Sequence, residues 1–203
     1  MGSLATLAQA LGLSYAAGIN LYATVAVVGL AERFGVIGPL PGALGGMSHP
    51  VVIGIAGLLY AIEFLATLVP GIASVWETAH SFIRPPAAAF LAAATAWGGD
   101  AALVTAATLL GGSLALGTHA TKLGVRYAID TSPEPVTNGA ANIAELGMVA
   151  AVIAFVWEHP FLVLAGAVVM LVALALTVRM VWRALKRVFT GRGDRGEAPA
   201  NGT

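Results

Sequence analysis

Three side chains that can carry charge or protons fall close together in the stretch "WETAHSFIRPP". Glu77, His80 and Arg84 are spaced i, i+3 and i+7, so on a helix they would lie along one stripe. They directly follow a long apolar run. An acid, an imidazole and a guanidinium on one helical face could form half of a polar site.

A second stretch repeats this spacing with His119, Lys122 and Arg126, and Asp130 lies one turn further on. Ammonium and guanidinium groups on one face suit an anion or a lipid phosphate, with arginine making bidentate contacts. The two stripes therefore predict a basic site near the cytoplasmic side. Ordinary basic residues at cytoplasmic helix ends, with local pairs such as Glu77–His80, are the alternative.

Glu63 is the one charged residue in the apolar run 51–69. A carboxylate within a membrane segment is a candidate proton carrier or cation ligand. A neutral carboxyl group bonded to a neighbouring helix, for example to Asn20 or Tyr22, is the alternative. Those two residues give the first apolar run a partly polar face, which suits either interhelical hydrogen bonds or a pore lining. Glu145 is a similar buried-carboxylate candidate.

The stretch 130–145, "DTSPEPVTNGAANIAE", is dense in prolines and polar groups. Its prolines forbid a regular helix there, and Asn138 is expected to cap the helix that follows. With Glu134 and Glu145 it predicts a structured polar element.

The composition predicts the kind of secondary structure that carries these residues. The chain of 203 residues is 58% hydrophobic and only 10% charged, whereas soluble domains carry about 25% charged residues. Several apolar runs reach the roughly 20 residues that cross a bilayer as a helix. We therefore expect an all-α integral membrane protein. The zero net charge gives no reason to expect nucleic acid as a partner, and the absence of cysteine excludes thiolate chemistry.

About six membrane-inserted helices are predicted, some of them short or re-entrant. They cover 8–32, 50–69, 86–98, 101–128, 138–157 and 160–187. Together they predict one helical domain over 1–190, with possible halves 8–98 and 101–187, and a disordered polar tail over 191–203.

With six crossings and both termini in the cytoplasm, all basic residues except Arg33 fall on the inner side. This predicts a multi-pass protein of the cell inner membrane.

A weak internal repeat aligns "LGLSYAAGINLYAT" from Leu11 with "LGGSLALGTHATK" from Leu110. A second match pairs His49-Pro50 with His159-Pro160, but the two matches do not describe a clean duplication. If each half holds three crossings, the halves are inverted, as in many transporters.

Two stretches, 69–93 and 118–145, resemble a bacterial integral-membrane family known as a domain of unknown function. Its motifs appear here as Trp76…His80…Arg84-Pro85 and as Lys122…Arg126, Ser132-Pro133-Glu134-Pro135, Asn138 and Glu145. The chain departs from the family where Thr67 and Leu68 replace a charged pair and where Leu146 replaces an aspartate. The resemblance implies a small helical membrane protein and brings no substrate.

The leading hypothesis is a transporter or channel for an ion or a small solute, and the predicted basic site suits an anionic one. The alternatives are a protein that binds or moves anionic lipid headgroups and a non-transporting membrane scaffold. The polar groups form no recognisable catalytic set, so no enzyme, cofactor or metal is predicted. The expected partners are the bilayer, the solute and a second copy of the chain in a homodimer.

Overall fold

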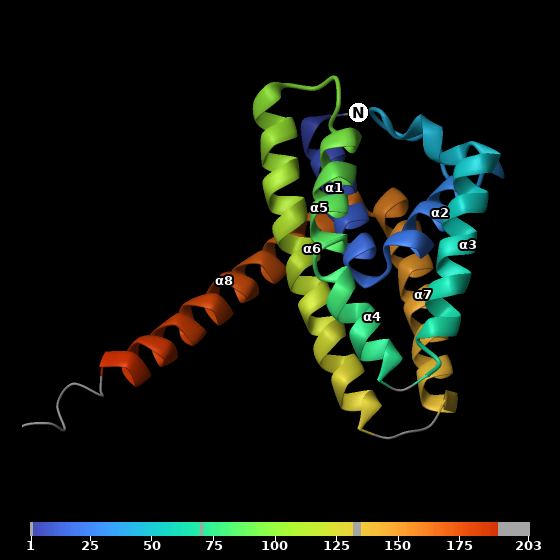
Figure 1. The fold of residues 1–203 in the computed structure, drawn as a ribbon. Helices are drawn as coiled ribbons and strands as arrows, with labels where there is room; N and C mark the ends of the chain where they lie inside the picture. The colour runs from blue at the N-terminus through green and yellow to red at the C-terminus, as the bar shows by residue number, and fades with distance from the viewer. Residues whose placement is uncertain (1, 70, 132–134, 191–203) are drawn as a thin grey trace, which may run out of the picture.

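The fold was analysed in a computed structural model that describes residues 2–69, 71–131 and 135–190. All regular structure in these ranges is helical, and no strand occurs in them, as predicted (Figure 1). The elements are α1 (Ser3–Ile19), α2 (Leu21–Arg33), the 3-10 helix η1 (Leu44–Ser48), α3 (Pro50–Ala66), α4 (Ile72–His80), α5 (Arg84–Thr95), α6 (Ala101–Asp130), α7 (Pro135–Glu158) and α8 (Pro160–Thr190). The predicted tail over 191–203 lies outside the described residues.

Three helices, α6, α7 and α8, are long and apolar enough to cross a membrane. The apolar helices α1 and α3 have 17 residues each, or about 26 Å, which is slightly less than a hydrocarbon core of about 30 Å. The helices are thus consistent with a membrane-embedded protein. They do not establish the six crossings predicted from the sequence.

The first predicted segment, 8–32, is not one helix. Asn20 has extended backbone angles (φ −152°, ψ 110°) and separates α1 from α2. Its side-chain oxygen accepts a hydrogen bond from the Ala23 N–H at 2.9 Å, which caps α2. An asparagine can compete with the helical hydrogen bonds in this way, and here that local bond ends one helix and begins the next.

The stripe of Glu77, His80 and Arg84 is also divided. Glu77 and His80 lie in the last turn of α4, whereas Arg84 is the first residue of α5. Pro85 and Pro86 follow, and neither can donate a backbone hydrogen bond to the preceding turn. The helix therefore ends and restarts, and the single uninterrupted stripe was a wrong prediction.

The second stripe is confirmed as part of one helix, because His119, Lys122 and Arg126 all lie buried on α6.

The prediction that Asn138 caps the helix that follows the prolines of 130–145 does not agree with the structure. Helix α7 begins at Pro135, a residue that suits the first helical position. Asn138 therefore lies inside the first turn and does not cap the helix as predicted.

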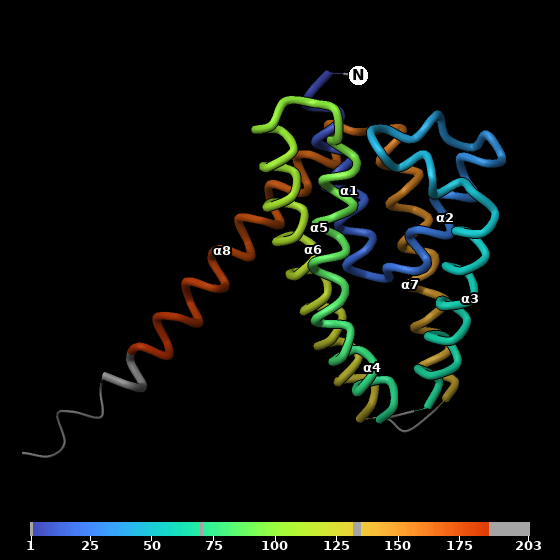
Figure 2. The backbone as a smooth tube through the Cα atoms, turned by 45° about the horizontal axis from the view of Figure 1, so that its top comes forward, coloured from blue at the N-terminus to red at the C-terminus, as the bar shows by residue number. Residues whose placement is uncertain are grey.

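The bundle is built around α1, which packs against α5, α6, α7 and α8. Residues 8–14 and 16–19 of this helix are buried. Both views show the C-terminal half of α8 running away from the other helices (Figures 1 and 2).

The internal repeat suggested by the sequence finds no support in the helices. The break at Asn20 aligns with His119, which lies within the uninterrupted helix α6.

Helices α1, α5 and α6 approach closely at Gly111. A Cβ atom there would lie 2.5 Å from Ser14 Oγ and 2.7 Å from Ala92 Cβ. We expect Gly111→Val to lower the free energy of unfolding by about 1–3 kcal/mol, because the added volume forces the helices apart. Denaturant unfolding in detergent micelles measures this. Gly124→Val, on the same helix but with open space around the new Cβ, is the control. Equal stability of the two variants would contradict the close approach.

Candidate functional site: a buried charge network

Six charged side chains meet inside the bundle, and we call them the charge network. They come from five helices and are Glu63 (α3), Glu77 (α4), Arg84 (α5), Lys122 and Arg126 (α6), and Glu145 (α7). None is more than 7% exposed.

Glu63 accepts three contacts through one oxygen. Its Oε1 lies 2.6 Å from Arg84 Nη2, 2.7 Å from Asn20 Nδ2 and 3.4 Å from Lys122 Nζ. Its other oxygen, Oε2, is buried without a hydrogen-bond partner among the described residues. The predicted bond to Asn20 is therefore present, but Glu63 also faces two cations.

Lys122 joins the three acids. Its ammonium lies 2.8 Å from Glu77, 2.8 Å from Glu145 and 3.4 Å from Glu63. The three carboxylates bring one oxygen each within 4.8 Å of one another, a spacing that a metal ion could bridge. Here the ammonium provides the positive charge that keeps the three anions together.

Two guanidinium groups complete the network. Arg84 forms ion pairs with Glu63 and Glu77, so it connects α3 with α4. Arg126 contacts Glu145 through Nε at 2.9 Å and Nη2 at 2.6 Å.

Three cations therefore face three carboxylates, and their formal charges cancel. Burying such groups is expensive unless each is paired, which this arrangement achieves. The sequence predicted a basic site, but the geometry is neutral. Arg84, Lys122 and Arg126 also lie inside the bundle. The positive-inside rule counts basic residues in loops, so these three give no information about the orientation of the chain in the membrane.

Hydrogen bonds show which ring nitrogens donate and which accept in the two histidines next to the network. Arginine can only donate, so His119 Nδ1 accepts from Arg84 at 3.1 Å and Nε2 donates to Ser81 at 2.9 Å. His80 donates from Nδ1 to the Trp76 carbonyl at 2.8 Å, and Tyr22 lies 3.3 Å from Nε2. Both imidazoles thus fit the neutral form. Glu77 and His80, named above as a local pair in the alternative interpretation, bond to other residues: Glu77 to Arg84 and Lys122, and His80 to Trp76.

Asn138 does not join the network. Asn138 is fully buried, and its Nδ2 lies 3.5 Å from Asp130 Oδ1, near the end of α6. Asp130 also accepts a short hydrogen bond from Ser74. Glu134 lies outside the described residues.

Sequence reasoning missed Asn142, which connects three helices. Its Oδ1 accepts from Arg126 and, at 3.1 Å, from Thr67 Oγ1, while its Nδ2 donates to the Phe64 carbonyl. Asn142 lies three residues before Glu145 on α7, so the i, i+3 spacing could have identified it.

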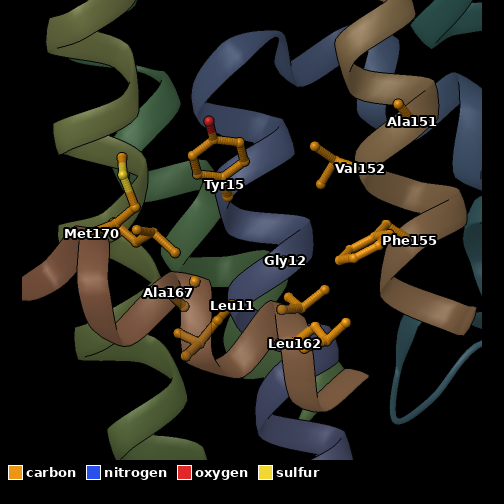
Figure 3. A pocket seen from close by; sticks show the side chains of 12 residues that line it. Leu11, Gly12, Tyr15, Ala151, Val152, Phe155, Leu162, Ala167 and Met170 are labelled. Carbon is orange, nitrogen blue, oxygen red and sulfur yellow. The ribbon is translucent and has the colours of Figure 1, made fainter. Parts of the chain in front are cut away.

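Two cavities lie beside the network, between α1, α6, α7 and α8. The first, of about 510 Å³, is lined almost entirely by apolar side chains (Figure 3). The second, of about 420 Å³, has similar walls but includes Lys122 and Glu145. Tyr15 and Met170 line both cavities, so the two adjoin.

The helices and their buried ion pairs define a helical protein with charged groups in its interior, and three of its helices are long and apolar enough to cross a membrane. The chain belongs to the family described as Domain of unknown function (DUF4126), whose model matches residues 7–180. No curated protein and no solved structure matches it. The inner-membrane location, the cytoplasmic termini and the homodimer stay predictions from the sequence.

Proposed function

We propose that this protein transports an ion or another small charged solute across the membrane and that the charge network is the binding site. The observation that carries the proposal is that two interrupted helical segments end at this network. One break lies between α1 and α2, and the other lies between α4 and α5.

At the first break, Asn20 performs two tasks. Its Oδ1 caps α2, and its Nδ2 donates to Glu63 at 2.7 Å. The hydroxyl of Thr24, one turn into α2, donates to the Asn20 carbonyl at 2.7 Å. The break is therefore bonded both to α2 and to the network.

At the second break, residues 81–83 separate the last turn of α4 from α5. Glu77 and Arg84 lie on opposite sides of this turn and form an ion pair across it. Ser81, within the turn, bonds to His119 on α6.

Non-helical backbone inside a bilayer is tolerated only where protein buries it or where it lines a cavity. In many transporters, interrupted helices of this kind form the substrate site, and one helix bundle moves against the other around that site to give alternating access. Buried charges support the same interpretation. An apolar core would hold the helices together at lower cost, and ionisable groups within membrane segments usually mark a transport path.

The neutral network can serve a substrate of either charge. An anion would replace a carboxylate at Arg84 or Arg126, whereas a cation would replace the Lys122 ammonium among the three acids. The flux experiment therefore screens anions and cations, and the solute that moves gives the sign of the substrate's charge.

Solute flux in proteoliposomes tests the proposal. Ions and small organic solutes of both charges are screened with the wild type, and Glu63→Gln is then measured for the solute that moves. We expect this variant to reduce flux at least tenfold, because it removes the negative charge that faces Arg84 and Lys122.

Glu158→Gln is the matched control, since Glu158 is exposed at the end of α7 and outside the network. It should transport like the wild type. Wild-type flux that Glu63→Gln leaves intact would remove the network from the transport path. No wild-type flux of any screened solute would favour the scaffold hypothesis.

A further inference from the structure

The two adjoining cavities form one groove along α7. Residues of α7 line it from Ala141 beside the charge network to Phe155 near the helix end. These two residues are 14 positions apart in the sequence, which corresponds to about 21 Å of helix rise. We call this the α7 groove, and Figure 3 shows its apolar end.

The far end of the groove is apolar. Leu11, Val152, Phe155, Leu162 and Met170 are among its walls, and Gly166 leaves open space beside them. Water is a poor occupant of such a space, because it would find few hydrogen-bond partners. The walls include α6, α7 and α8, the three helices suited to crossing a membrane, so the medium nearest to the groove is lipid.

The near end of the groove carries two opposite charges. The ammonium of Lys122 and a carboxylate oxygen of Glu145 lie 2.8 Å apart there, and Thr118 and Thr121 are beside them. Helix α6 has 30 residues and is about 45 Å long, longer than a core of about 30 Å. Its polar C-terminal part, from Lys122 to Asp130, therefore belongs toward one edge of that core, where lipid headgroups begin.

A ligand that matches the groove has a long apolar chain and a polar head. Since Lys122 and Glu145 cancel each other, a head of net charge gains little there, whereas a zwitterionic head offers a phosphate to Lys122 and an ammonium to Glu145. This differs from the anionic lipid expected from the sequence, because three carboxylates now neutralise the basic residues.

We propose that the α7 groove binds a phospholipid with a zwitterionic phosphoethanolamine head, with one acyl chain in the apolar end and the head beside Lys122 and Glu145. This site does not depend on the transport proposal, since a non-transporting protein could hold the same lipid.

Gly166→Phe tests the groove directly. Gly166 lines its apolar end, and a Cβ atom added there meets nothing within 4 Å, so the ring can fill the space without a clash at its base. Gly54→Phe is the matched control. Gly54 is exposed on α3, away from the groove, and has the same open space.

The full chain is delipidated in detergent and equilibrated with equal amounts of phosphatidylethanolamine and phosphatidylglycerol of the same acyl chains. Native mass spectrometry then measures the retained lipid. We expect the wild type and Gly54→Phe to retain phosphatidylethanolamine in excess over phosphatidylglycerol, and we expect Gly166→Phe to retain at least tenfold less of it.

Unchanged retention in Gly166→Phe would overturn the groove as the site. Equal retention of the two lipids by the wild type would overturn the assignment of the head. Neither outcome alters the flux experiment, which depends on Glu63, so failure of the lipid site and failure of transport are separable.

Discussion

Arg84→Met is expected to lower the free energy of unfolding by about 3–5 kcal/mol, the range for removing one partner of a buried ion pair. Arg84 is fully buried and pairs with both Glu63 and Glu77. Without the guanidinium, only Lys122 and Arg126 remain to balance three carboxylates. Denaturant titration in detergent micelles, followed by circular dichroism, measures the change.

Arg33→Met is the matched control, since Arg33 is exposed at the end of α2, and we expect an effect within about 0.5 kcal/mol. The double variant Arg84→Met/Glu77→Gln should recover part of the lost stability, because it removes one of the acids left without a cation. A double variant less stable than Arg84→Met would show that the network does not balance charge in this way.

Asn20→Ala should lower the free energy of unfolding by about 2.5–4 kcal/mol. The N-cap of α2 accounts for about 1 kcal/mol of this, and the hydrogen bond to the Glu63 carboxylate for about 1.5–3 kcal/mol. The same titration measures it.

Asn20→Ser separates the two roles of this residue. Serine keeps a side-chain oxygen that can cap α2, but it is too short to replace the amide that donates to Glu63. We expect its stability to fall between that of Asn20→Ala and the wild type. If Asn20→Ser were as stable as the wild type, the bond to Glu63 would contribute nothing.

The membrane class and several network residues could be predicted from the sequence, for different reasons. Hydropathy depends only on composition along the chain, so the apolar helices were predictable. His119, Lys122 and Arg126 share a face because α6 is uninterrupted, and their spacing alone predicted this.

The two helix breaks and the pairing of charges were harder to predict from the sequence. Asn20 lies in a run that reads as one apolar helix, and its bond to Glu63 joins residues 43 positions apart. The sequence showed three acids and three bases but not that Lys122 lies among all three carboxylates. Such pairing depends on how five helices pack, and periodicity within one helix carries no information about this.

The distribution of the charge network along the chain also has a consequence for biosynthesis. A chain inserted only as far as α5 holds Glu63, Glu77 and Arg84, with one negative charge in excess. Arrival of α6 adds Lys122 and Arg126 and reverses the sign, and Glu145 on α7 restores neutrality. The nascent bundle therefore cannot balance its interior charge until its seventh helix is in place.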